Sequence, residues 1–134
     1  MTTDRVQELF SSAPVNRYIG LRLIERDEDH VLVELAVQQE LLQETGVVHG
    51  GVLTALADTA AIYLIIPDAL DAGERVTSIE FKMNFLKAAT LDGGVLQARS
   101  RPVKRGRRVV VCEVDVNQAE NHVARGTFTY LKYE

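Results

Sequence analysis

The sequence predicts an α+β fold in which a curved antiparallel sheet of about six strands wraps around one long helix. Residues 51–66 form a single apolar stretch of helical length, and shorter stretches with strand-like patterning lie before and after it. The helical stretch has no broad polar face, so other elements must cover most of its surface. A curved sheet gives that cover.

Length and composition place residues 1–134 in one domain. A chain of 134 residues with 46% hydrophobic and 25% charged residues has the composition of an ordinary globular domain. A net charge of −4 argues against a protein built to bind nucleic acid. The N-terminus lacks the pattern of a secretory signal, and no apolar run approaches the roughly 18 residues of a membrane span. We therefore expect a cytoplasmic protein without membrane contacts.

Two helices are predicted. Residues 4–11 form a short amphipathic helix with Val6, Leu9 and Phe10 on one side, and Pro14 ends it. Residues 51–66 form the long helix, which Pro67 ends. Small residues let neighbouring backbone come close to this helix, and they are the alanines at positions 55, 57, 60 and 61.

The predicted strands fall into two groups. Residues 21–26 and 31–37 form a hairpin about the turn DEDH, and a polar loop over residues 38–48 leads to the long helix. Four strands follow at residues 76–86, 94–103, 108–116 and 122–131, with short polar connections typical of an antiparallel meander. Their second, partly apolar face predicts dimerisation through an edge or a face of the sheet. The lone Cys112 lies inside VVVCEV, which favours a buried structural thiol over a catalytic one.

The stretch VVHGGVLTALADTA opens the long helix with two glycines. A helix N-terminus exposes unpaired N–H groups and a partial positive charge, and glycine lets a ligand approach the main chain closely. Gly50 and Gly51 can therefore offer N–H donors to a carbonyl oxygen that gains negative charge during acyl transfer. The alternative is that His49 simply caps the helix and the glycines form a tight loop.

Asp58 is the one acid in this apolar helix, eight residues after Gly50. Eight residues of helix span roughly 12 Å, which is too far for both groups to act on one carbon atom within one subunit. A site that joins them needs Gly50 of one copy to face Asp58 of another. The alternative is a carboxylate satisfied by a neighbour, such as Thr54 one turn earlier or an arginine of the sheet.

Three stretches resemble the hotdog-fold acyl-CoA thioesterases, most closely the PaaI-like group that includes the second class of 4-hydroxybenzoyl-CoA thioesterases. They are GVVHGGVLTALADTA, VTSIEFKMNFLKAA and RGRRVVVCEVDV, and the resemblance covers nearly the whole chain, from about Pro14 to Tyr133. It implies a hotdog fold paired into dimers and often into dimers of dimers. It also implies active sites at the subunit interface.

The resemblance also implies roles for single residues. Asp58 is the catalytic nucleophile or general base, the Gly50 N–H polarises the thioester carbonyl, and His49 shapes the loop. Gln43 stands where the family commonly has Asn, with the same amide on a longer arm. Ser78 matches a hydroxyl that holds the attacking water in some members; Thr77 points to the opposite face of the strand. The residues expected to contact substrate are Gly51, Thr59 and Ser78.

A basic cluster surrounds Gly106 in the sequence PVKRGRR, and its members are Lys104, Arg105, Arg107 and Arg108. It is either a solvated turn or a clamp for the phosphates of coenzyme A. Nucleic acid has similar electrostatics, but the chain is acidic and the turn has no aromatic residue. The resemblance favours the coenzyme A clamp.

The sequence therefore predicts a homo-oligomeric acyl-CoA thioesterase. It needs no cofactor, since coenzyme A is part of the substrate, and no metal, since the histidines at positions 30, 49 and 122 are scattered. No serine-hydrolase elbow or phosphate-binding loop is present. Two alternatives stay open: a hotdog hydratase or dehydratase, for which only His49 could be the acid–base residue, and a non-catalytic acyl-CoA sensor, which would not need Asp58.

Overall fold

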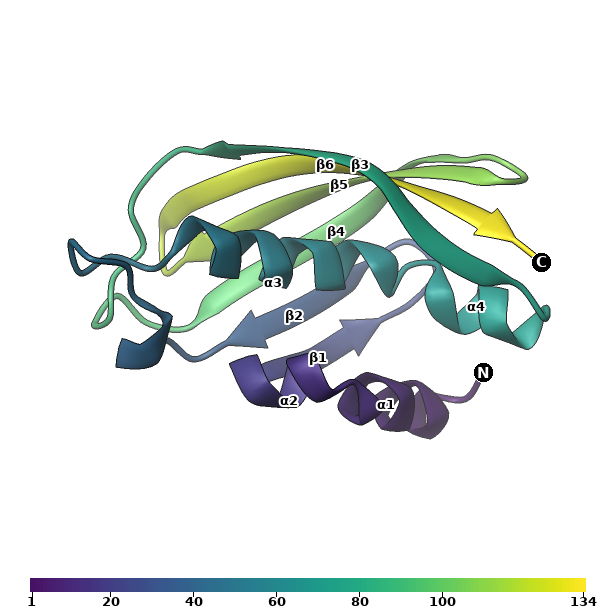
Figure 1. Cartoon of the computed structure of the whole chain (residues 1–134), viewed down its shortest axis with the longest axis horizontal. Coiled ribbons are helices and arrows are strands. Elements are labelled where there is room, and N and C mark those ends of the chain that lie inside the picture. The colour runs from purple at the N-terminus through teal and green to yellow at the C-terminus, as the bar shows by residue number, and fades with distance from the viewer.

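The computed structural model describes residues 1–134 and consists of one antiparallel sheet curved around helix α3 (Figure 1). The six strands lie in the order β1-β2-β4-β5-β6-β3, which confirms the predicted α+β class. The helices are α1 (Thr3–Ser12), α2 (Pro14–Ile19), α3 (Gly50–Ile62) and α4 (Ile66–Asp71), with a 3-10 turn at Gln39–Leu41. The strands are β1 (Leu21–Arg26), β2 (Val31–Leu35), β3 (Arg75–Phe85), β4 (Leu96–Arg105), β5 (Val109–Gln118) and β6 (Asn121–Tyr133).

Helix α3 is shorter than predicted, and Pro67 does not end it. The helix ends at Ile62, and the Tyr63 N–H bonds back to the carbonyls of Thr59 and Ala61. Pro67 lies in the first turn of α4, where a missing N–H costs nothing because that group has no partner inside the helix. The alanine-rich centre of α3 packs against the sheet, and its fully buried residues are Leu56, Ala57, Ala60 and Ala61.

A second N-terminal helix was missed by the sequence prediction. Pro14 follows the end of α1, as expected, but it also begins α2, which ends at Gly20 with a left-handed φ of 93°. Helix α1 contributes Val6 and Phe10 to the core, and the Phe10 ring meets Tyr63 edge-on at 4.9 Å. The N-terminal helices therefore cover the end of the core beside β1 and α4.

The predicted four-strand meander is wrong in its first member. Strands β4, β5 and β6 do follow one another, but β3 pairs only with β6, at the far edge of the sheet. The pairing runs from Arg75 opposite Tyr133 to Phe85 opposite Ala124, with a bulge between Ser78 and Glu80. The chain then crosses from this edge to β4. One long edge of β3 consequently has no strand beside it.

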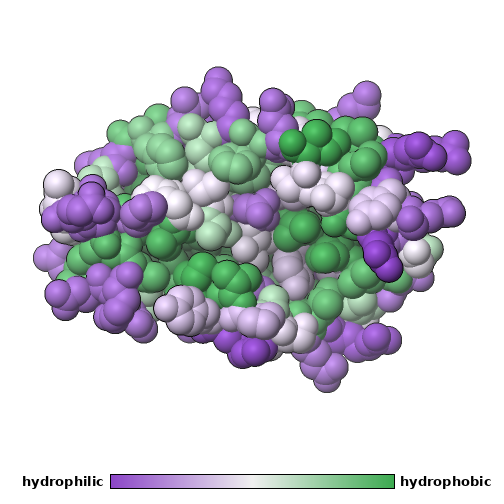
Figure 2. Space-filling view, in the orientation of Figure 1, coloured by the Kyte–Doolittle hydropathy of each residue, from purple (hydrophilic) through white to green (hydrophobic).

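The inner face of the sheet forms the core. Strand β5 alternates strictly: its buried apolar positions are Val110, Cys112, Val114 and Val116, and Gln118 is buried at its end. The Cys112 thiol lies 3.8 Å from the Ala61 carbonyl oxygen, and burial raises its pKa to about 11, which confirms the buried position. On the face that carries α3, hydrophobic residues form much of the surface, and most of the hydrophilic ones lie at its periphery (Figure 2). None of the helices has the length and apolar content needed to cross a bilayer.

Candidate active site

The N-terminus of α3 presents a free main-chain donor. His49 is the N-cap residue, and its Nδ1 accepts a hydrogen bond of 2.9 Å from the Gly51 N–H. The Gly50 N–H, by contrast, donates to no group of the chain. Because Gly50 is the first residue of the helix, its N–H lies at the positive end of the helix dipole. The capping role considered for His49 is therefore real. The expectation that both glycines offer free N–H groups is wrong for Gly51, whose N–H is held by His49, and only the Gly50 N–H is left for a ligand.

An apolar cavity adjoins Gly50. The Phe85 ring at the end of β3 lies 3.4 Å from the position that a Cβ at residue 50 would take. The cavity has a volume of about 350 Å³ and is lined by Val47, Val48, Gly50, Leu53, Phe85, Leu86, Lys87, Ala88 and Ala89. A group bound at the Gly50 N–H would therefore have apolar walls beside it.

Gln43 lies in a tight turn beside the start of α3. Leu42 pairs with Val48, and the Gln43 N–H donates to the Val47 carbonyl at 2.8 Å, so the loop folds back beside the start of α3. The side-chain oxygen of Gln43 accepts from the main chain of Thr45 and, at 2.7 Å, from its hydroxyl. The side-chain NH2 of Gln43 has no partner in the chain. Its two N–H groups are the part of Gln43 left for a ligand.

Asp58 is half-buried in α3, and its partner is Tyr130 of β6. The Tyr130 hydroxyl lies 2.5 Å from Asp58 Oδ1 and 3.2 Å from the Asp58 main-chain oxygen. Neither Thr54 nor an arginine of the sheet, the two neighbours considered as partners of a structural Asp58, contacts its carboxylate. Thr54 donates instead to the Gly50 carbonyl at 2.9 Å, and no arginine forms an ion pair with Asp58.

Sequence reasoning missed Tyr130. It is 72 residues away from Asp58, and only the position of β6 beneath α3 brings the two together. The one available signal was a tyrosine in a strand that alternates buried and exposed positions, because a buried phenol needs a hydrogen-bond acceptor.

The two hydroxyl groups predicted to contact substrate, those of Ser78 and Thr59, differ in their surroundings. Ser78 stands directly opposite Tyr130 in the β3–β6 pairing, so both side chains lie on the face of the sheet that carries α3. Thr77 points to the other face, as expected for its neighbour in a strand. The Thr59 hydroxyl donates to the Ala55 carbonyl at 2.7 Å, one turn back along the helix. Ser78 thus lies on the Asp58 side of the sheet, whereas the Thr59 proton is used within α3.

The basic cluster forms the β4–β5 turn, at the end of the molecule away from the start of α3 (Figure 1). Glycine is required at position 106, because a Cβ there would lie 2.5 Å from the Val109 carbonyl oxygen. Arg105 donates to the Glu28 carbonyl and so ties this turn to the β1–β2 turn. The other three basic residues line a hollow of about 540 Å³ whose walls are Lys104, Gly106, Arg107, Arg108, Val109 and Val111.

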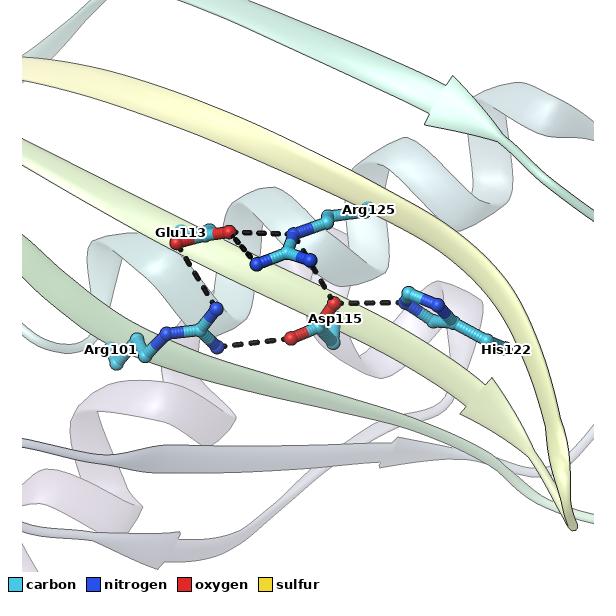
Figure 3. A network of polar contacts seen from close by, with 5 residues as sticks. All are labelled: Arg101, Glu113, Asp115, His122 and Arg125. Carbon is cyan, nitrogen blue, oxygen red and sulfur yellow. Dashed lines mark hydrogen bonds and ion pairs between the residues drawn. The ribbon is translucent and has the colours of Figure 1, made fainter.

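A second polar cluster lies on the face of the sheet away from α3, and its members contact one another (Figure 3). Glu113 and Asp115 of β5 stand between Arg101 of β4 and Arg125 of β6 and pair with both. His122 contacts Asp115 at 2.8 Å. Because every charge has an opposite partner, the cluster supports the sheet and offers no free group to a ligand. Nowhere do three metal-ligating carboxylates, thiols or imidazoles come together.

A sequence profile of the thioesterase superfamily matches residues 45–124, more than half of the chain. The chain belongs to the thioesterase superfamily. The matched segment runs from the loop before α3 into β6, so it includes Gly50, Asp58 and Ser78.

Three known proteins show how this superfamily member compares. Its structure resembles a thioesterase of Haemophilus influenzae, with a TM-score of 0.85, 24% identity and coverage of 100% of this chain and 92% of that one. The PaaI protein from the phenylacetic acid degradation operon of E. coli has a TM-score of 0.86, 22% identity and coverage of 98% and 92%. A medium/long-chain acyl-CoA thioesterase of Salmonella typhimurium is 26% identical over 88% of this chain and 84% of that protein. The two structures confirm the predicted hotdog fold.

Proposed function

We propose that this protein is an acyl-CoA thioesterase that works as a homodimer with two composite active sites. The observation that carries the proposal is the arrangement of α3: a free N–H at Gly50 and a carboxylate at Asp58 on one continuous helix. The two positions are roughly 12 Å apart along the axis. Each is suited to one side of a thioester carbonyl, and two copies of the chain supply both.

The free edge of β3 supports the dimer. This strand carries exposed apolar side chains, with Ile79 54%, Phe81 52% and Phe85 54% exposed. An open edge with apolar residues favours pairing with a second strand. A two-fold axis across β3 aligns the partner's β3 in the antiparallel direction, so the start of the partner's α3 approaches the middle of this subunit's α3. Gly50 of one protomer then faces Asp58 of the other.

The chemistry follows from these two groups. Asp58 attacks the thioester carbon directly, or it takes a proton from the water that attacks; the carbonyl oxygen becomes an oxyanion held by the Gly50 N–H of the partner. The C–S bond then breaks. The departing thiolate becomes free coenzyme A by taking the proton that Asp58 holds in the general-base route, or a proton from solvent in the direct route. In the direct route, water hydrolyses the resulting anhydride. Ser78 lies on the face of the sheet that carries α3 and Asp58, and its hydroxyl can bind the attacking water.

The basic turn supports coenzyme A as the leaving group. Lys104, Arg107 and Arg108 form no ion pair within the chain, and they line one hollow. The two-fold arrangement brings the start of the partner's α3 toward this end of the molecule. Phosphate groups of a bound coenzyme A would contact the free guanidinium and ammonium groups there. Arg105 contributes less, because its guanidinium already holds the Glu28 carbonyl.

The test is an assay with a panel of aromatic, short-chain and long-chain acyl-CoAs, in which the release of free thiol measures hydrolysis. We expect at least one class to be hydrolysed, and Asp58→Asn to lower kcat by about a thousandfold or more while coenzyme A still binds. An Asp58→Asn variant as active as the parent would exclude this mechanism. Binding of acyl-CoA without turnover by the parent would instead identify a sensor, and reversible hydration of an enoyl-CoA would identify a hydratase.

A further inference from the structure

The strongest contact of Asp58 comes from a side chain with no role in the chemistry described above. The Tyr130 hydroxyl lies 2.5 Å from Asp58 Oδ1, and the side chain of Tyr130 is completely buried in the core. The second carboxylate oxygen, Oδ2, accepts no hydrogen bond within the chain. One oxygen of the carboxylate is therefore held, and the other is free.

The Tyr130 hydroxyl is a permanent donor. Burial and the neighbouring Asp58 charge raise the pKa of Tyr130 far above its usual value, so the phenol keeps its proton at any working pH. The other titratable group that acts on it, the Cys112 thiol of β5, is neutral because burial raises its pKa to about 11. No basic side chain forms an ion pair with Asp58. Tyr130 is thus the group that stabilises the negative charge of this carboxylate.

We infer that Tyr130 is a positioning residue: its phenol fixes Asp58 Oδ1 so that Oδ2 points to the thioester or to the attacking water. This role rests on the proposed thioesterase function. A carboxylate on a helix has rotational freedom about two side-chain bonds, and a buried donor from the sheet removes most of that freedom.

The test variant is Tyr130→Phe, which removes one oxygen and keeps the ring in the core. We expect kcat to fall by about ten- to a hundredfold, because the charged hydrogen bond and the fixed orientation are both lost, while KM for the acyl-CoA changes little.

Tyr63→Phe is the matched control. Tyr63 is also buried, and burial raises its pKa to about 12, but its hydroxyl makes no hydrogen bond. It lies beyond the end of α3, in edge-on contact with Phe10, and has no place in the active site. We expect Tyr63→Phe to keep the parental kcat and the parental KM. If Tyr130→Phe behaves in the same way, the positioning role is wrong.

The orientation of the Asp58 carboxylate separates this inference from the proposed function. Crystal structures of the parent, Tyr63→Phe and Tyr130→Phe would show this carboxylate in the folded protein without any substrate. We expect one orientation in the parent and in Tyr63→Phe, and more than one in Tyr130→Phe, because the hydrogen bond to Asp58 Oδ1 is lost. Failure of the parent to hydrolyse any acyl-CoA would contradict the thioesterase proposal; a single, unchanged orientation in Tyr130→Phe would contradict the hold of Tyr130 on Asp58.

Discussion

Gly50 allows a main-chain group to be tested by substitution. It is the first residue of α3, where proline is accommodated, and the residue before it, His49, has the extended ψ of 134° that precedes proline. Gly50→Pro removes the free N–H and should lower kcat by about a hundredfold or more at a near-parental melting temperature. Gly50→Ala keeps the N–H. Its kcat should fall less, and only because the added methyl group partly obstructs the cavity near Phe85. Equal kcat values for the two variants would show that the N–H does not hold an oxyanion.

Cys112 should be inert in the folded protein. With a pKa of about 11, roughly one thiol in a thousand is ionised at pH 8, and the side chain is completely buried. We expect no reaction with a disulfide reagent over the time of an activity assay and one thiol per chain after unfolding. Rapid labelling of native protein at pH 8 would contradict the buried position.

The candidate residues could be predicted to different degrees. His49, Gly50 and Asp58 lie within one segment whose local pattern, a helix start and a lone acid, carries chemical meaning. Tyr130 could not be identified as the partner of Asp58, because their contact depends on which strand lies beneath α3 and in which register. The hydrogen bond between the Gln43 side-chain oxygen and Thr45 could not be predicted either, because it depends on the geometry of the turn.

At the level of elements, three strands of the sheet are joined by the charged cluster on the outer face (Figure 3). Burial opposes ionisation of Asp115, but hydrogen bonds from Arg101 and His122 and the charge of Arg125 outweigh it, so the pKa of Asp115 is lowered. A lowered carboxyl pKa stabilises the folded state above the unfolded value, near 4, and this contribution is lost as pH falls through the folded pKa.

Asp115→Asn should therefore lower the free energy of unfolding at neutral pH, by about 1 kcal/mol or less because the cluster is partly solvated. The difference from the parent should shrink as pH falls below about 4, where the parent's carboxylate is protonated as well. Denaturant unfolding between pH 2 and pH 7 measures both curves. A difference that grows toward low pH would contradict the assigned direction of the pKa shift.

The elements themselves were predictable where periodicity was strong. The alternation in β5 and the apolar run of α3 gave the type of each element. The order of the strands was not predictable, because alternation identifies a segment as a strand but not which strand lies beside it, and β3 lies at the edge next to β6. Pro67 was misinterpreted because proline both ends one helix and begins another, and only the turn at Tyr63 distinguishes the two.

At the level of the whole molecule, the dimer is expected to form through β3. Ile79→Arg places a charge among the exposed apolar residues of that edge and should yield monomers with little activity. Tyr18→Arg is the control, since Tyr18 is 91% exposed on α2, and it should leave the assembly intact. Light scattering after size exclusion gives the mass. A parent protein that hydrolyses acyl-CoA as a monomer of 14.9 kDa would contradict the composite site.

The most direct test of the composite site mixes two inactive proteins, Asp58→Asn and Gly50→Pro. In a mixed dimer, one site carries both substitutions and the other carries neither. Random exchange of subunits should therefore restore about a quarter of the parental kcat per chain, with mixed dimers counted by native mass spectrometry. Activity that stays at the level of the separate variants, although mixed dimers are present, would contradict a site shared between Asp58 of one protomer and Gly50 of its partner.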